Sequence, residues 1–151
     1  MTAKPTRKQR ELLESGRIAR MATVDECGKP HAVPICYSYD SGLIYTPIDK
    51  KPKSVTVNNL GRIKNIRSNP YVSIVIDKYY EDWDRLYYLK VSGLASIIQE
   101  GEEYRSSLMG LCDKYSQYRD MNLLYLGLPV IRVVPLQIVS WGDVKSTGKL
   151  S

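Results

Sequence analysis

The sequence has few of the side chains from which metal sites and disulfide frameworks are built. It contains one histidine, His31, and three cysteines, Cys27, Cys36 and Cys112, which lie far apart and form no C-x-x-C pair. A single histidine argues against a histidine-based metal site, so we expect no bound metal. An odd number of dispersed cysteines is typical of free thiols in a reducing compartment.

Long apolar segments are missing as well. No run approaches the roughly 20 residues that a membrane-spanning helix requires. The first ten residues are basic and polar and lack the apolar stretch of a secretory signal. We therefore expect a cytoplasmic protein with no membrane partner.

Common catalytic and nucleotide-binding motifs are absent. The glycines match neither G-x-G-x-x-G nor the P-loop, and no G-x-S-x-G is present. A Cys–His pair would have to use His31, so acyl transfer by a protein nucleophile is not expected. Glu81, Asp82 and Asp84 fit a solvated loop better than a metal or acid–base site. The sequence thus identifies no catalytic residue.

The charge is unevenly distributed. The chain has 22 Lys and Arg and 16 Asp and Glu residues, a formal net charge of +6. The whole excess lies between residues 50 and 76, which include no acidic residue, and the rest of the chain is balanced. Clustered cations repel one another without a counter-anion, and arginine and lysine suit phosphate, so we expect an anion site rather than only a solvated helix face. The cations are Lys50, Lys51, Lys53, Arg62, Lys64 and Arg67.

Hydrophobic periodicity predicts a mainly β domain. A chain of 151 residues buries about 70% of its unfolded surface and needs no cross-link to fold as one domain, residues 1–151, with a polar tail at 142–151. Alternation predicts six strands, at residues 17–24, 30–39, 43–48, 71–77, 86–98 and 130–141. Helical patterns cover residues 7–15, ended by Gly16, and also 60–68 and 100–115. Short connections favour antiparallel pairing, so we expect an α+β fold in which six strands close as a small barrel with helices at its ends.

Aromatic residues are concentrated in one segment, although the chain has no phenylalanine. Five of them fall within ten residues: Tyr79, Tyr80, Trp83, Tyr87 and Tyr88. Such residues commonly pack in a core or a dimer contact, and they also line pockets for planar ligands. The sequence leaves both interpretations open.

Several motifs follow one another in a fixed order along the chain. They are residues 17–24 (RIARMATV), 28–34 (GKPHAVP), 44–53 (IYTPIDKKPK) and 60–73 (LGRIKNIRSNPYVS). This order resembles the pyridoxamine-phosphate-oxidase-like split-barrel flavoproteins. Residues 77–83, followed by 91–95 (VSGLA), are similar to a branch of oxidoreductases that depend on the deazaflavin coenzyme F420. The resemblance spans residues 12–141.

The resemblance implies a split β-barrel homodimer with two cofactor sites at the subunit interface. It assigns the cofactor phosphate to Arg62 and Lys64 with Asn65, assisted by Lys50, Lys53 and Thr46, and it places the ring beside Pro34 and Cys36. Tyr79 and Trp83 would line the substrate pocket. Lys78 replaces a histidine of the branch, and Tyr87-Tyr88 replaces a tryptophan pair, so we expect different substrate contacts.

The function implied is hydride transfer between F420 and a small organic acceptor, with the chemistry supplied by the cofactor. FMN is the alternative cofactor, although six cations exceed what one FMN phosphate needs and would also suit the polyglutamate tail of F420. Two other functions stay open: a flavin or haem carrier without turnover, and a barrel that binds single-stranded nucleic acid. Both are much less favoured than the oxidoreductase. The nucleic-acid barrel ranks ahead of the carrier, although its cations and its aromatic residues lie in separate segments, which argues against a nucleic-acid groove.

Overall fold

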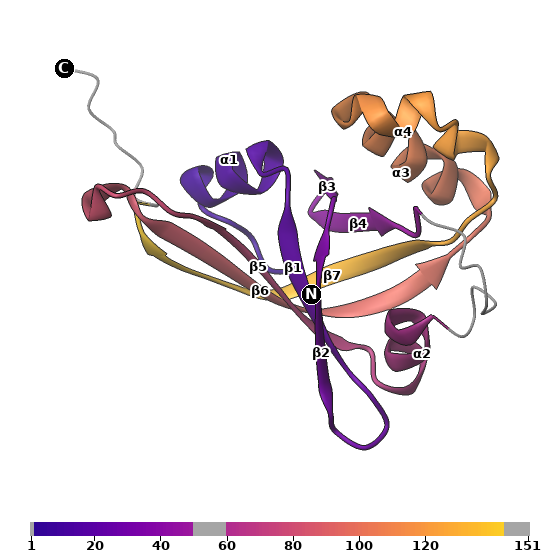
Figure 1. Cartoon of the computed structure of the whole chain (residues 1–151), viewed down its shortest axis with the longest axis horizontal. Helices are drawn as coiled ribbons and strands as arrows, with labels where there is room; N and C mark the ends of the chain where they lie inside the picture. Colours follow the sequence, from indigo (N-terminus) through magenta and orange to yellow (C-terminus); the bar gives the residue numbers. More distant parts are fainter. Residues whose placement is uncertain (1, 50–59, 144–151) are drawn as a thin grey trace.

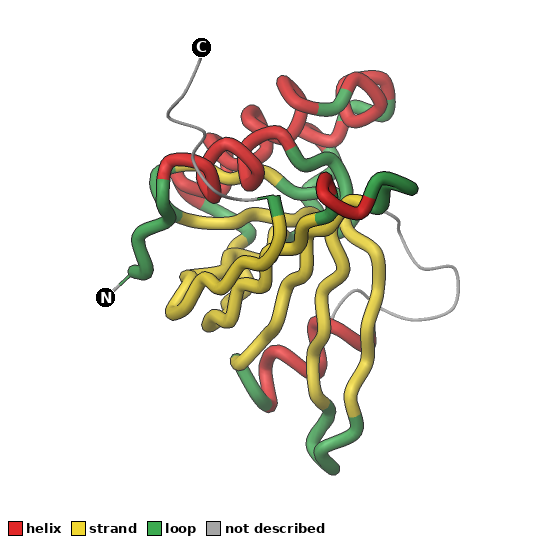
Figure 2. The backbone as a smooth tube through the Cα atoms, turned by 90° about the vertical axis from the view of Figure 1, so that its left-hand side faces the viewer, coloured by secondary structure: helices red, strands yellow, loops and turns green. Residues whose placement is uncertain are grey.

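A strongly curled β-sheet with flanking helices forms the molecule (Figures 1 and 2). The structure, a computed structural model, describes residues 2–49 and 60–143. The strands are β1 (Ala19–Val24), β2 (Pro30–Ile35), β3 (Ser38–Asp40), β4 (Leu43–Pro47), β5 (Tyr71–Lys78), β6 (Tyr87–Ile98) and β7 (Val130–Gly142). The helices are α1 (Arg7–Ser15), α2 (Gly61–Ser68), α3 (Gly101–Lys114) and α4 (Ser116–Asp120), with short 3-10 helices η2 (Trp83–Arg85) and η3 (Leu123–Tyr125).

All seven strands belong to one antiparallel sheet in the order β2-β1-β5-β6-β7-β4-β3. The two edge strands, β2 and β3, follow each other in the chain and are joined only by Cys36 and Tyr37. Because the chain passes directly from one edge to the other, the sheet has to curl into a half-barrel (Figure 1).

The prediction of six strands is wrong, since the strand expected at residues 30–39 is two strands. β2 pairs with β1 in an antiparallel hairpin, whereas β3 pairs with β4. Tyr37 interrupts the ladder because it is fully buried and its polar groups bond elsewhere. Its hydroxyl donates to the Leu13 carbonyl at 2.7 Å, and its amide donates to the Tyr115 hydroxyl at 3.1 Å.

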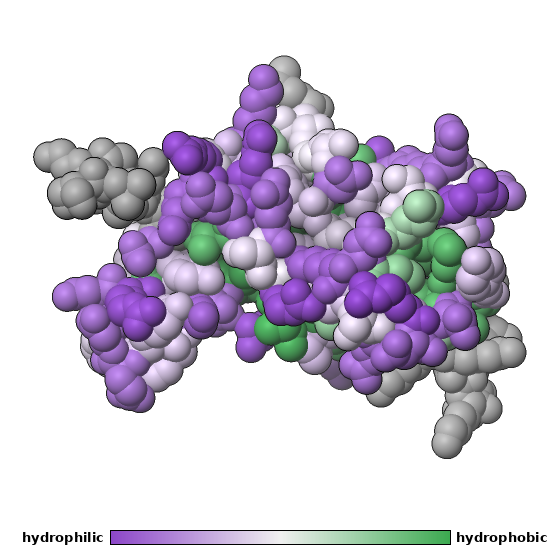
Figure 3. Space-filling model, turned by 90° about the horizontal axis from the view of Figure 1, so that it is seen from above, coloured by the Kyte–Doolittle hydropathy of each residue, from purple (hydrophilic) through white to green (hydrophobic). Residues whose placement is uncertain are grey.

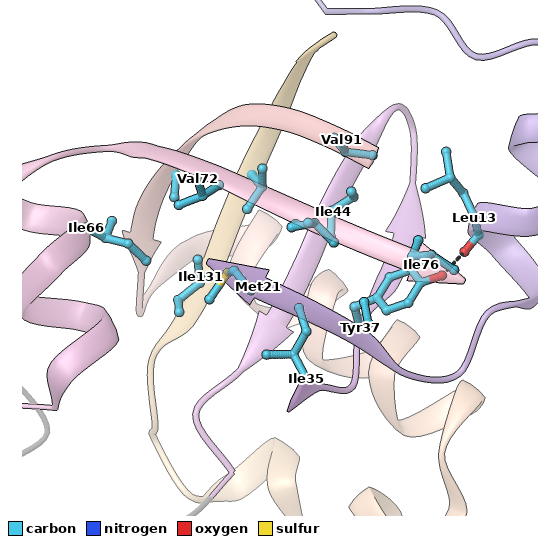
Figure 4. Packing of buried hydrophobic residues seen from close by; sticks show 14 of the residues in the cluster. Leu13, Met21, Ile35, Tyr37, Ile44, Ile66, Val72, Ile76, Val91 and Ile131 are labelled. Atoms are coloured by element: carbon cyan, nitrogen blue, oxygen red, sulfur yellow. Dashed lines mark hydrogen bonds between the residues drawn. The ribbon is translucent and has the colours of Figure 1, made fainter. Parts of the chain in front are cut away.

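Alternate residues of the long strands fill the interior of the half-barrel (Figure 4), as the period of two predicted. Leu13 of α1 and Ile66 of α2 join this core. The central strands contribute Val72, Ile74, Ile76, Leu89 and Val91, all buried.

Helix α1 begins and ends as predicted. Thr6 and Gln9 form a reciprocal capping box, and the Gly16 amide donates to the Leu12 carbonyl at 2.9 Å. Gly16 has φ −60°, so it is not required for a left-handed turn. A Cβ atom at this position would instead lie 2.3 Å from the Tyr37 hydroxyl oxygen, so close packing requires the glycine.

Helices α3 and α4 pack on the side of β4 that faces away from the core inside the half-barrel. Ile44 and Tyr45 are consecutive on β4 and therefore face opposite sides; Ile44 lies in the main core, and Tyr45 packs in a second cluster with Leu108 and Leu111 of α3. The short helix α4 was not predicted. Figure 3 shows a mainly hydrophilic surface with hydrophobic residues gathered at the right, on the side where Figure 1 places α3 and α4.

In residues 2–49 and 60–143, no helix is both long and apolar enough to cross a bilayer. The three cysteines are free, with Cys27 at the surface. Within the same part of the chain, no three histidine, cysteine or acidic side chains converge as metal ligands would.

Candidate functional site

The end of β4 is tied to the link between the two edge strands. Thr46 is 1% exposed, and its hydroxyl donates to the Cys36 carbonyl at 2.7 Å. This bond holds β4 against the point where the chain crosses from β2 to β3. Thr46 and Cys36, both assigned to the cofactor, are thus brought together, and the Thr46 proton is already used within the protein.

A cavity of about 270 Å³ opens beside this link. The Tyr115 and Tyr118 rings pack edge to face, with centroids 5.3 Å apart and an interplanar angle of 62°. The walls combine these two tyrosines with two sulfur-containing side chains, one amide and one carboxylate. The lining residues are Cys36, Asp49, Tyr115, Gln117, Tyr118 and Met121.

Asp49 and Tyr118 form the polar contact of this cavity. Tyr118 is 5% exposed, and its hydroxyl donates to Asp49 Oδ2 at 3.0 Å. Burial raises the pKa of Tyr118, and the charge of Asp49 raises it further, so the phenol stays protonated as a hydrogen-bond donor.

Arg62 lies in the first turn of α2. Its Nε is a buried nitrogen with no hydrogen-bond partner among the residues that the structure describes. Burial lowers the pKa of the Arg62 guanidinium, while the nearby Asp49 and Tyr118 oppose that shift. A half-buried cation with an unused donor is suited to an anionic oxygen.

Lys64 and Asn65 do not share this position. Successive helical residues are about 100° apart, so Lys64 lies on nearly the opposite side of α2 from Arg62. Lys64 is exposed and borders a separate hollow of about 230 Å³ beside Asp25, in the β1–β2 turn, and His31, at the start of β2. Asn65 is 5% exposed and donates to the Thr23 hydroxyl at 3.0 Å, which fastens α2 to β1.

The remaining predicted residues lie elsewhere. Pro34 is exposed on the edge strand β2, outside the residues that line the cavity at Cys36. Tyr79 and Trp83 are 65% and 71% exposed in the β5–β6 loop. Lys50 and Lys53 lie outside the described residues.

The loop with Tyr79 and Trp83 is distant from Arg62 within one chain. The eight residues of β5 run from the end of α2 to this loop, a length of about 25 Å at 3.3 Å per residue. Figure 1 shows the loop and α2 at opposite ends of the sheet. A single chain therefore does not bring the two expected halves of the site together.

A sequence comparison decides the family. The family model described as pyridoxamine 5'-phosphate oxidase matches residues 5–132, which is most of the chain. The chain belongs to the pyridoxamine 5'-phosphate oxidase family. This confirms the family predicted from the ordered motifs. No curated protein matches the chain.

Solved structures share the fold of this oxidase-family chain. A conserved hypothetical protein from Mycobacterium tuberculosis is 20% identical, with 93% of this chain and 86% of that chain covered and a TM-score of 0.75. HutZ, the heme storage protein from Vibrio cholerae, is 17% identical, with coverage of 88% and 90% and a TM-score of 0.68. A FAD-binding protein from Mesorhizobium loti is 18% identical, with coverage of 87% and 89% and a TM-score of 0.60.

The oxidase-family chain also has site residues that sequence reasoning missed. Asp49 directly precedes the basic run that begins at Lys50. An acidic residue next to a predicted anion site is unusual, and this was the one feature of the sequence that could have drawn attention to Asp49. Tyr118 gave no signal because α4 has only five residues and no clear period. Only the fold shows that α4 reaches the end of β4.

Lys114, at the end of α3, is a partly buried cation that the sequence analysis did not single out. Its Nζ donates to the Gly16 carbonyl and lies 4.2 Å from the centroid of the Tyr37 ring. Burial and then the charge of Arg17 lower the pKa of Lys114 to about 8. Its donor is engaged with the end of α1, so we assign it a structural role.

Proposed function

We propose that the chain binds a phosphate-bearing flavin-type cofactor, F420 or alternatively FMN, and transfers hydride to or from a small organic acceptor. The buried Arg62 Nε without a partner among the described residues is the observation that carries this proposal. The membership in the pyridoxamine 5'-phosphate oxidase family supports it.

The residues present fit such a cofactor. Arg62 would hold an anionic oxygen of the phosphate, and its partial burial strengthens that contact by excluding water. Lys50 and Lys53 would assist it, as the resemblance implies, whereas the exposed Lys64, on the other side of α2, would contribute only longer-range charge. Cys36 would border the ring, and Pro34 lies outside the cavity that Cys36 lines. The bound deazaflavin or flavin supplies the hydride chemistry, and the protein contributes binding, orientation and exclusion of water.

We also propose that a second copy of the chain completes each site. Tyr79 and Trp83 are too far from Arg62 in one chain to share a ligand with it, and both are largely exposed. Their loop carries three acidic residues, Glu81, Asp82 and Asp84, which complement the basic segment between residues 50 and 67. A two-fold dimer would place the loop of one copy over the anion site of the other.

Cofactor titration tests the first part. Purified protein is titrated with F420 and, separately, with FMN, and the fluorescence of the ring is followed. We expect saturable F420 binding that weakens strongly in Arg62→Ala and only slightly in Lys64→Ala, because Lys64 lies on the other side of α2. FMN binding at micromolar concentration with no response to F420 reverses the cofactor assignment, and no response to either refutes the proposal.

Subunit mixing tests the shared site. Arg62→Ala and Trp83→Ala each damage both sites of a homodimer, whereas a mixed dimer regains one site with both native residues. We expect about half of the native cofactor-dependent activity in mixed dimers. A monomer in solution, or mixtures no more active than the parent variants, would show that each chain works alone.

The likeness to a heme storage protein supports a second candidate, a haem carrier without turnover. His31 is the one histidine of the chain, and its side chain is 49% exposed with Nε2 3.7 Å from Asp25 Oδ2. A histidine beside a carboxylate is a suitable axial ligand. A haemin titration that gives a Soret band in the native protein and a weaker one in His31→Ala would support the carrier.

A further inference from the structure

One face of the sheet is left open to solvent along four strands. Residues that point into the core alternate with residues that point away from it on β1, β5, β6 and residues 137–142 of β7, and we call the second set the outer face. The helices pack elsewhere, because α1 and α2 contribute to the core inside the half-barrel and α3 packs against Tyr45 of β4. On the outer face, Tyr71 is 63% exposed and Trp141 is 55% exposed. Large apolar side chains of this face are therefore in contact with water in a single chain.

The outer face also carries little charge. Its charged side chains in the described strands are Arg20, Asp77 and Lys90. Arg20 Nη1 and Asp77 Oδ1 are 2.6 Å apart, so these two charges compensate each other within the chain. Tyr88 and Trp141 stack across the β6–β7 ladder, with ring centroids 6.0 Å apart and an interplanar angle of 19°. The solvated face of an antiparallel sheet is usually polar, so an aromatic face with so few charges indicates a contact surface.

We propose that the outer face is the surface through which two copies of the chain associate. In a two-fold dimer the same surface lies on both sides of the contact, so a net charge on it is repelled by its own copy. A face whose charges are one internal ion pair and Lys90 meets this requirement. A nucleic acid would instead require several cations, and a strongly charged protein partner would require the opposite charge. Tyrosine and tryptophan are also among the side chains enriched in protein interfaces.

The shape of the sheet determines where two copies touch. Because the sheet curls into a half-barrel, two outer faces meet along the middle strands, β5, β6 and β7, and diverge toward the edges (Figure 2). The Tyr88–Trp141 stack lies at the end of these strands next to the β5–β6 loop, and Tyr71 lies at the end next to α2. A two-fold axis that crosses the strands sets the stack of one copy against the Tyr71 end of the other, and it places the β5–β6 loop beside α2 of the other copy. The association itself needs no cofactor, whereas completion of the anion site by that loop rests on the proposed function.

The first experiment measures the dimer dissociation constant by sedimentation velocity over roughly a hundredfold range of protein concentration. We expect a dimer for the native protein and association weaker by roughly tenfold or more in Val75→Glu, because each new charge is desolvated against its own copy. Val75 pairs with Arg20 and Lys90 of the neighbouring strands, so the new carboxylate has a cation on each side and the single chain keeps its fold, which circular dichroism checks. Trp141→Ser, which removes one ring of the stack without adding charge, should also weaken association. Met109→Glu is the matched control, because it places the same charge on an exposed apolar position of α3.

The second experiment shows which face is covered. The chain has two tryptophans, so Trp83→Tyr leaves Trp141 as the fluorescent tryptophan. We expect acrylamide to quench Trp141 slowly in the dimer, and faster once Val75→Glu is added to separate the copies. The converse variant, Trp141→Tyr, keeps an aromatic ring on the outer face and reports in the same way whether the second copy covers Trp83.

The outcomes separate this inference from the proposed function. A monomer at every concentration, association unchanged in Val75→Glu and Trp141→Ser, or equal weakening in Met109→Glu overturns the outer face as the contact. Equal quenching of Trp141 in the dimer and in the separated chains overturns it as well. Shielding of Trp141 with full exposure of Trp83 supports the contact and refutes a site completed by the loop. A dimer with Trp141 shielded that binds neither F420 nor FMN supports the contact and refutes the proposed function.

Discussion

Replacing Arg62 with methionine should weaken cofactor binding and stabilise the empty protein at the same time. Methionine keeps much of the apolar stem of arginine and removes the buried Nε, which has no partner among the described residues. A hydrogen bond from a charged donor contributes about 1.5–3 kcal/mol. Because Arg62 is only partly buried, we expect a loss toward the lower end of this range, about 1–2 kcal/mol, roughly 5- to 30-fold in Kd.

The effect on stability has the opposite sign. An unsatisfied buried donor costs about 1–3 kcal/mol, and partial exposure of Arg62 reduces that cost. The free energy of unfolding of the empty protein should therefore rise by about 1 kcal/mol in Arg62→Met. Asp49 loses the charge of Arg62 but keeps the hydrogen bond from Tyr118, which limits the opposing loss.

Cofactor titration and urea unfolding of the empty protein measure the two effects. Arg105→Met is the matched control, because it removes an exposed arginine from the helix α3. We expect little change in either measurement for this control. The reasoning fails if Arg62→Met binds cofactor within about threefold of the native protein, or if Arg105→Met weakens binding equally, which would mean that the charge acts only at long range.

Three further predictions concern the contacts around Tyr37. Tyr37→Phe removes the hydroxyl that donates to the Leu13 carbonyl and should lower the free energy of unfolding by about 1–2 kcal/mol in urea titrations. Gly16→Ala places a Cβ 2.3 Å from that hydroxyl and should cost about 1–3 kcal/mol, a penalty that shrinks in the Tyr37→Phe background; equal penalties in both backgrounds would contradict the close contact. The pKa of Lys114, about 8 when folded, lies below its unfolded value of 10.5, so the unfolded chain binds more protons between these values and stability from this group rises with pH there. Urea unfolding at pH 7 and pH 9 should show this rise in the native protein, and Lys114→Met should show a smaller one.

Most of the sheet could be predicted because its strands are long and half-buried. The alternation of Val72, Ile74 and Ile76 places one face of β5 in the core regardless of what packs on it. The break between β2 and β3 could not be predicted in this way. It depends on the bonds of Tyr37 to Leu13 and Tyr115, which lie 24 and 78 residues away in the chain.

The candidate site likewise has a part that the sequence predicts and a part that depends on tertiary packing. The basic segment was evident from charge alone, and of its three cations within the described residues, Arg62 is partly buried while Lys64 and Arg67 are exposed. Charge could not show which of Arg62 and Lys64 is turned toward the rest of the protein, since that depends on where α2 docks. The contact between Asp49 and Tyr118 joins residues 69 positions apart and follows only from the packing of α4.

The composition of β2 has a consequence for how copies of this chain can associate. β2 is an edge of the sheet, and proline cannot donate to a ladder, so Pro30 and Pro34 are placed with their nitrogens toward the free edge. In a strand, alternate residues point their backbone N–H groups in the same direction. Of Pro30, Ala32 and Pro34, only Ala32 therefore offers an N–H group to the free edge. The other edge, β3, is only three residues long. Both edges thus resist extension of the sheet by a neighbouring strand, so any second copy would have to associate through side chains on the sheet faces and loops.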